Sequence, residues 1–281
     1  MNDVISLTHG PWRALVVPGC GLNTVSLTCR GAPILRPPPS LAALEAEPCL
    51  YGIPLLLPPN RTGGGTFSFG GTAYRLPVNE PQTGNHLHGL LCRAPFTVTE
   101  RTEHTLSAVY VNDGACFPFP FSIRGDYTLS GGGFSQTFSI RNTGGADMPL
   151  TFGLHTVFAE QPRFRVPISR RWAVDGRHLP TGALLPLTAQ EQSYRQGTHS
   201  RGRSVRGFFT AAGSTAQIGA MCYTVSPLFD QWVLWNGDGQ SGFCAIEPLQ
   251  GAVNALNSGV GLRRLRPGET IRYTTRIHPA P

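Results

Sequence analysis

Strict alternation of apolar and polar residues is the feature that most constrains what this chain can fold into. Residues 23–29 read Asn-Thr-Val-Ser-Leu-Thr-Cys, and residues 133–140 and 269–278 alternate in the same way. Successive side chains of an extended strand point to opposite faces, so each stretch places one face on a core and the other toward water. The alternation therefore predicts β-strands that cover a hydrophobic core on one side.

Turn residues separate these stretches. The chain has 34 glycines and 25 prolines, which are spread between apolar runs as turn residues are. Gly70-Gly71 joins residues 66–69 to residues 72–76 and predicts a hairpin with a two-residue turn. Further strands are predicted at residues 13–17, 96–100, 105–111, 122–129, 148–153, 217–223, 232–235 and 243–247.

Helix is predicted in one place only, residues 40–47, where Ser40 is a suitable N-cap and Pro48 ends the segment. Many short strands joined by closely spaced turns predict an all-β fold, a large antiparallel β-sandwich with very little helix. Because the sequence contains no linker and no repeat, we expect residues 1–281 to form a single domain.

Charge and cysteine content argue against several classes of function. All 23 basic residues are arginines and the formal net charge is +7, but the sequence has no Arg-rich helix or other nucleic-acid-binding signature. The seven cysteines include no C-x-x-C pair, which disfavours a disulfide framework or a metal site. Residues 1–10 lack an apolar leader, and no run approaches ~18 apolar residues. We expect a cytoplasmic monomer or weak homodimer without nucleic-acid or membrane partners.

Two residues are candidates for acid–base chemistry because each ends an apolar run. Glu247 follows Phe-Cys-Ala-Ile, where desolvation would raise the pKa of the carboxyl and make it a better base near neutrality. The alternative is a buried carboxylate paired with an arginine. His155 follows Leu-Thr-Phe-Gly-Leu, and its alternative is a core histidine whose hydrogen bonds are satisfied.

A metal or phosphate site receives less support. His86 and His88 stand two residues apart and would share one face of a strand, as zinc ligands can. No third ligand stands at a suitable spacing, so we predict no metal. The glycine runs at residues 63–65 and 131–133 open no helix, and we expect them to form turns instead of phosphate-binding loops.

Four short motifs occur in a fixed order along most of the chain. They are Asn60-Arg61, His88-Gly89, His155-Thr-Val-Phe158 and Glu247-Pro248. In this order and spacing the sequence resembles the aldose 1-epimerase (galactose mutarotase) family. Flanking segments agree with the resemblance: residues 51–54 (Tyr-Gly-Ile-Pro), 172–180 and 265–269.

The resemblance implies a fold, a reaction and roles for particular residues. The fold is the galactose mutarotase-like super-sandwich, with a sugar across one face. The reaction interconverts the α and β anomers of a hexose without a cofactor. Glu247 is implied as the general base and His155 as the general acid. The residues implied to bind the sugar are Asn60, Arg61 and His88.

Three further residues are candidate sugar contacts. Trp232 and Trp235 lie on one predicted strand, where we expect them to share a face and form an aromatic floor; the alternative is core packing. Arg206 stands where the family usually has a sugar-binding Asp. Whether Asp230 or Asp238 replaces that Asp is left open.

The departure at Arg206 keeps two alternatives open, as does Thr-Val after His155 where the family often has Pro-Tyr. In the first, the substrate is a hexose 6-phosphate and Arg206 clamps the phosphate. In the second, the chain is a sugar-binding or regulatory module without turnover. The retained His155 and Glu247 argue against the second alternative.

Overall fold

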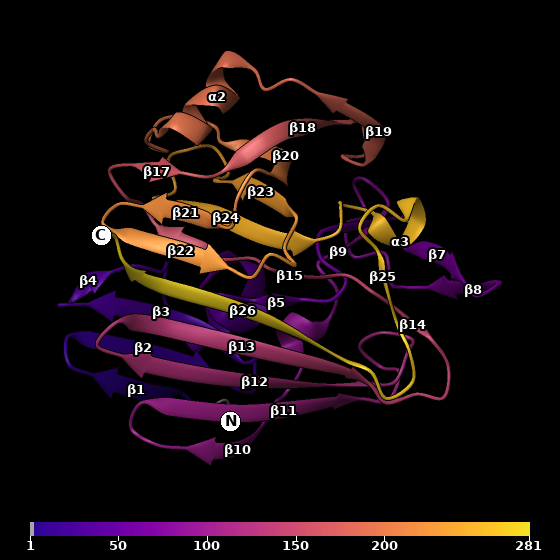
Figure 1. Cartoon of the computed structure of the whole chain (residues 1–281), viewed down its shortest axis with the longest axis horizontal. Coiled ribbons are helices and arrows are strands. Elements are labelled where there is room, and N and C mark those ends of the chain that lie inside the picture. Colours follow the sequence, from indigo (N-terminus) through magenta and orange to yellow (C-terminus); the bar gives the residue numbers. More distant parts are fainter. Residues whose placement is uncertain (1–2) are drawn as a thin grey trace.

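Two eight-stranded antiparallel sheets dominate the structure, a computed structural model that describes residues 3–281 (Figure 1). The first sheet has the order β10 (Thr97–Arg101), β11 (Thr105–Asn112), β12 (Phe121–Ser130), β13 (Gly133–Asn142), β26 (Thr270–Pro279), β22 (Met221–Val225), β21 (Thr215–Ile218) and β17 (Phe164–Arg165). The second has the order β19 (Pro180–Leu185), β18 (Ile168–Val174), β20 (Arg206–Ala211), β23 (Gln231–Trp235), β24 (Phe243–Gln250), β15 (Phe152–Leu154) and β5 (Leu55–Leu56), and β16 (Val157–Ala159) also pairs with β24.

Smaller elements surround the two large sheets. An N-terminal sheet consists of β1 (Ile5–His9), β2 (Trp12–Val17), β3 (Asn23–Cys29) and β4 (Ala32–Pro33). Three two-stranded sheets pair β6 (Arg61–Gly63) with β9 (Asn85–Leu87), β7 (Thr66–Phe69) with β8 (Thr72–Arg75), and β14 (Met148–Leu150) with β25 (Arg263–Leu265). The helices are α1 (Leu41–Ala46), α2 (Ala189–Gln196) and α3 (Ala255–Ser258), with 3₁₀ turns η1 (Pro48–Leu50) and η2 (Leu91–Arg93).

Aromatic side chains fill the space between the two large sheets. Phe152 of the second sheet contacts Phe138 and Tyr273 of the first, with ring centroids 5.6 and 5.0 Å apart. Trp232 of the second sheet likewise meets Tyr223 of the first. All five side chains are at most 1% exposed, so each sheet turns one face to a shared core. The opposite face of the second sheet, which we call the outer face, is free to carry polar groups.

Most sequence predictions of local structure are confirmed. The all-β sandwich with very little helix is present, and the β7–β8 hairpin turns at Gly70-Gly71. Ser40 caps α1 by accepting a hydrogen bond from the Ala43 N–H, 3.1 Å away. Within residues 3–281, no helix has the length and hydrophobicity needed to cross a membrane.

Three predictions of local structure are wrong. The single strand predicted at residues 217–223 is a hairpin, because Gly219 adopts a positive φ and the chain reverses between β21 and β22. The strand predicted at residues 148–153 is two strands of different sheets, β14 and β15, separated by Thr151. The third error is the prediction of helix at residues 40–47 only, since α2 is a second α-helix. Thr188 and Glu191 form a capping box at its start, and this T-x-x-E pattern is the signal that the sequence analysis missed.

Asn23 anchors the segment that leads into the second sheet. Its carboxamide accepts a hydrogen bond from the Ile53 N–H (2.8 Å) and donates to the Tyr51 carbonyl (3.0 Å). The side chain is fully buried, so water cannot replace these partners.

We therefore expect Asn23→Ala to lower the free energy of unfolding by about 2–3 kcal/mol, because it leaves a buried N–H and a buried carbonyl unpaired. Urea denaturation measures this loss. Thr97→Ala, at an exposed strand position, is the control and should change the midpoint little. Equal midpoints for the two variants would contradict the anchoring role.

Candidate acid–base site

Strand register places Glu247 on the outer face of the second sheet. Glu247 pairs with Val233 of β23, and Ala245 pairs with Trp235, so these four side chains share one face. The neighbour Ile246 points the other way and belongs to the core cluster. The carboxyl side chain is nevertheless 2% exposed, because other segments cover it.

His155 reaches the same face by the same alternation. Phe152 and Leu154 of β15 point into the core, and Thr156 donates or accepts a hydrogen bond with the core hydroxyl of Tyr223. His155 lies between these inward positions, and its backbone N–H donates to the Pro54 carbonyl at 3.0 Å. Its Nε2 lies 3.4 Å from Oε1 of Glu247, although 92 residues separate the two in sequence. The structure therefore brings the predicted acid and base together.

The Asn60-Arg61 and His88-Gly89 motifs meet above this pair. The Asn60 carbonyl accepts the backbone N–H of His88 at 2.8 Å, and the Asn60 side chain accepts the backbone N–H of Arg61 at 3.1 Å. Gly89 has a φ of +67°, and a Cβ there would overlap the Leu57 carbonyl, so this close approach requires glycine. The His88 ring then lies edge-to-face against His155, with centroids 5.0 Å apart.

Unsatisfied polar atoms gather at this point. In the described residues 3–281, five buried side-chain polar atoms have no hydrogen-bond partner, and three of them are His88 Nδ1, His155 Nδ1 and Glu247 Oε2. Such atoms are rare in folded proteins because each carries a desolvation penalty. A fourth, Nε2 of the neighbouring His86, adds to the cluster. These atoms are available to a polar ligand.

Burial sets the protonation of the pair. It raises the pKa of Glu247 to about 8, an effect that the nearby Arg61 cation partly opposes. It lowers the pKa of His155 to about 4. Burial, together with His155, Arg61 and His86, also holds the pKa of His88 well below its usual range. Between about pH 4 and 8 the His155–Glu247 pair therefore carries one proton, and His88 is neutral.

Arg61 forms an ion pair with Glu80. Its Nη2 lies 2.6 Å from Oε1 of Glu80 and its Nε lies 2.9 Å from Oε2, a two-point ion pair at side chains 17% and 15% exposed. Sequence analysis missed Glu80, because it is 19 residues from Arg61 and lies in no recognisable motif. Cys49 was also missed, although the Glu247 carboxylate is close enough to raise its pKa, behind the larger effect of a hydrogen bond to Cys92.

Trp232 and Trp235 lie on opposite faces of the second sheet. Trp235 lies on the outer face, where its ring centroid is 6.2 Å from that of His155. Trp232 is buried in the core and donates its indole N–H to the Gly213 carbonyl at 3.1 Å. The expectation that they share a face is wrong, because a spacing of three residues on a strand puts side chains on opposite faces.

Arg206 lies directly opposite Trp235 in the β20–β23 register and thus on the outer face. Its guanidinium is exposed, and its bonds run to the Ser204 hydroxyl, 2.9 and 3.1 Å away. The two aspartates considered as replacements hold turns at opposite ends of β23. Asp230 accepts the Gly251 N–H and Asp238 accepts the Gln240 N–H, both through Oδ1.

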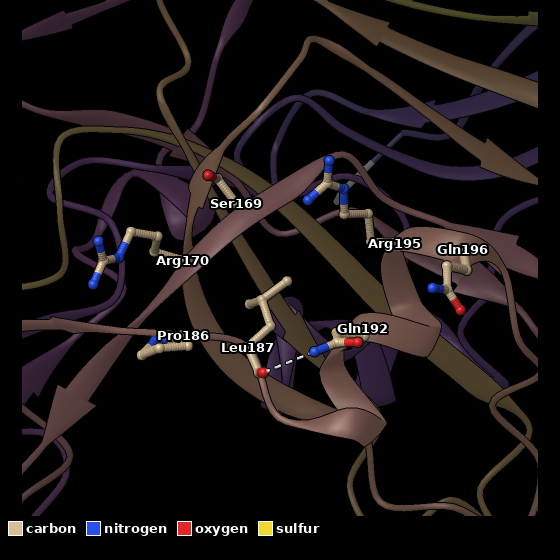
Figure 2. Close-up of a pocket in the computed structure, with 7 residues that line it drawn as sticks. All are labelled: Ser169, Arg170, Pro186, Leu187, Gln192, Arg195 and Gln196. Atoms are coloured by element: carbon tan, nitrogen blue, oxygen red, sulfur yellow. Dashed lines mark hydrogen bonds between the residues drawn. The ribbon is translucent and has the colours of Figure 1, made fainter.

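A cluster of metal ligands and a surface hollow are the other places where a functional site could lie. Within residues 3–281, no three His, Cys, Asp or Glu side chains group to hold a metal ion, and His86 Nδ1 instead lies 2.7 Å from the Pro77 carbonyl. A hollow of about 640 Å³ lies between β18, residues 186–187 and α2 (Figure 2), and neither His155 nor Glu247 lines it. The side chains that line it are Ser169, Arg170, Pro186, Leu187, Gln192, Arg195 and Gln196, without a carboxyl or imidazole.

Known proteins resemble this chain in both sequence and fold. The family model described as aldose 1-epimerase matches residues 3–278. The uncharacterized protein YihR of Escherichia coli K12 is 26% identical over 293 residues, covering 99% of this chain and 93% of YihR.

Solved structures show the same fold. A galactose mutarotase-like protein from Clostridium acetobutylicum superposes with a TM-score of 0.91 at 26% identity, over 99% of this chain and 95% of that one. An aldose epimerase homologue from C. elegans superposes with a TM-score of 0.83 at 16% identity, over 100% of this chain and 99% of that one. With the family model spanning nearly its whole length, this chain belongs to the aldose 1-epimerase family.

Proposed function

We propose that this protein interconverts the α and β anomers of a hexose, with Glu247 as general base and His155 as general acid. The observation that carries the proposal is the buried contact of these two groups, each with a polar atom left without a partner. Family membership and the similarity to the galactose mutarotase-like protein of C. acetobutylicum support an aldose as substrate.

The reaction conserves the single proton of the pair. Glu247 removes the proton of the anomeric hydroxyl while the His155 imidazolium protonates the ring oxygen, and the C1–O5 bond breaks to give the open aldehyde. The pair then consists of a neutral carboxylic acid and a neutral imidazole. After rotation about C1–C2, the reverse transfers close the ring on the other face of the aldehyde.

Arg61 and His88 assist the transfer of this proton. Burial favours the neutral form of both members of the pair, so in the free protein the proton resides on Glu247. Ring opening requires it on His155. The Arg61 cation favours the Glu247 carboxylate and so favours that transfer, and Arg61 and neutral His88 can donate hydrogen bonds to sugar oxygens on which negative charge grows. Trp235 supplies an aromatic surface for the apolar side of the ring.

His155→Ala and Glu247→Gln are each expected to lower kcat by about 10²–10⁴, the usual contribution of a general acid or base. NMR exchange between the anomers of glucose and galactose measures the rate after the spontaneous reaction is subtracted. Thr97→Ala serves again as a control with wild-type rate. Near-wild-type turnover in either variant would exclude its assigned role, and binding of sugar by the wild type without exchange would favour a non-catalytic module.

The pH dependence of kcat/KM should be bell-shaped, with limbs near pH 4 and pH 8. Below the lower limb the pair gains a second proton and loses its base, and above the upper limb it loses its only proton and with it the acid. Rates from pH 3.5 to 9, each corrected for the buffer-catalysed reaction, test this. A flat profile across pH 7–9 would contradict the one-proton mechanism.

A second candidate substrate is a hexose 6-phosphate, favoured by the position of Arg206. Within residues 3–281 its guanidinium forms no ion pair with a carboxylate, whereas Arg171 and Arg201 pair with Glu191 and Glu160. Arg206→Ala should raise KM for glucose 6-phosphate at least tenfold, as expected when a charge-assisted hydrogen bond is lost, and leave KM for glucose within about twofold. Arg203→Ala, also exposed, is the matched control. Equal effects on both sugars would count against the phosphate.

A further inference from the structure

Glu80 is the hub of a polar network that reaches the proposed site through Arg61. Both of its carboxylate oxygens accept hydrogen bonds from the guanidinium, at 2.6 and 2.9 Å. The Thr83 hydroxyl and the Asn85 carboxamide also donate to Oε2. These bonds hold the pKa of Glu80 below its ordinary value in spite of burial, so Glu80 is a carboxylate at neutral pH.

The backbone around Glu80 is closed on itself. Glu80 and Asn85 exchange two backbone hydrogen bonds of 3.1 and 3.2 Å across a short loop. The Asn85 carboxamide in turn donates to the Arg177 carbonyl at 2.9 Å and accepts from the Arg177 guanidinium at 3.1 Å. The loop therefore fixes the position of the Glu80 carboxylate, and the carboxylate in turn fixes the Arg61 guanidinium.

This arrangement leaves one side of Arg61 for a ligand. A guanidinium has five N–H donors in one plane, and the Nε and one Nη2 donor are taken by Glu80. Nη1 makes a long contact of 3.4 Å to the Asn60 side chain. The donors that remain on Nη1 and Nη2 are fixed in direction by the two-point ion pair.

We propose that Glu80 is a positioning residue, which orients Arg61 for the sugar and offsets part of the positive charge that Arg61 exerts on the acid–base pair. This role rests on the proposed function. Groups that face Glu247 are His155, Arg61, Cys49 and Cys244, and of these Arg61 is the permanent cation. Unbalanced by Glu80, that cation would stabilise the Glu247 carboxylate further and weaken it as a base.

Glu80→Gln tests both parts of the role. The variant keeps the size of the side chain but loses its charge and one acceptor, and kcat/KM for the preferred sugar should fall about 10- to 100-fold. Because the Arg61 cation is no longer offset, the pKa of Glu247 should fall, and the alkaline limb of the kcat/KM profile should move to lower pH. Glu80→Asp keeps the charge, so its alkaline limb should stay close to that of the wild type while its shorter reach still lowers kcat/KM.

Glu100→Gln is the matched control, since Glu100 also forms an ion pair with an arginine, Arg124, but on the first sheet. It should change neither the rate nor the limb. Titration of the Glu247 carboxyl by ¹³C NMR, assigned with Glu247→Gln, reads the shift without turnover. A wild type without anomer exchange would refute the proposed function, while the NMR shift would still report on Glu80. An unmoved Glu247 titration in Glu80→Gln, whether or not activity and the urea midpoint fall, would overturn the proposal.

Discussion

The unsatisfied burial of the Glu247 carboxyl beside His155 is the constraint on which the rest of the site depends. A carboxyl group taken out of water without a hydrogen bond to Oε2 is a cost to the fold, and it appears as a pKa raised to about 8. The unfolded chain releases this proton near pH ~4.3. The stabilising contribution of the protonated group is therefore fully present below that pH and is lost as the pH rises through about 8. Between these two pH values the folded protein keeps a proton that the unfolded chain has released, so the free energy of unfolding falls as the pH rises.

The core of the sandwich is what keeps this costly group in place. Ile246 and Leu154, packed between the sheets, fix which residues of β24 and β15 face outward. A slip of one residue in the β23–β24 register would turn Glu247 into the core, against the aromatic layer that contains Phe152 and Trp232. The apolar residues of the strands thus determine where the polar side chains of Glu247 and His155 lie.

Period-two alternation made the fold predictable, and apolar runs ending in Glu247 and His155 made the pair visible. Each of these signals is local, because the position of a residue along a strand determines which face its side chain occupies. The same rule, applied to the spacing of three residues between Trp232 and Trp235, would have placed the two rings on opposite faces. Helix α2 was equally within reach, since Thr188 and Glu191 form a capping box that can be read in the sequence.

The contacts of Arg61 could not be predicted in this way. Its partner Glu80 lies in a loop whose path follows from the Glu80–Asn85 backbone bonds and from Arg177 of a distant loop, and no periodicity records such contacts. Sequence patterns report which face a strand residue occupies, but they do not report which loops close over that face. The sheet residues were therefore found and the loop residue was missed.

The division between sheet and loops also bears on how such a site is tuned. Burial in the second sheet raises the pKa of Glu247, and the cation that lowers it comes from β6. The carboxylate that holds this cation comes from the loop between β8 and β9. Because loops tolerate substitution better than a packed sheet, a substitution in this loop can change the pKa of the proposed base without disturbing the strands. In this chain that adjustment passes through a single two-point ion pair between Arg61 and Glu80.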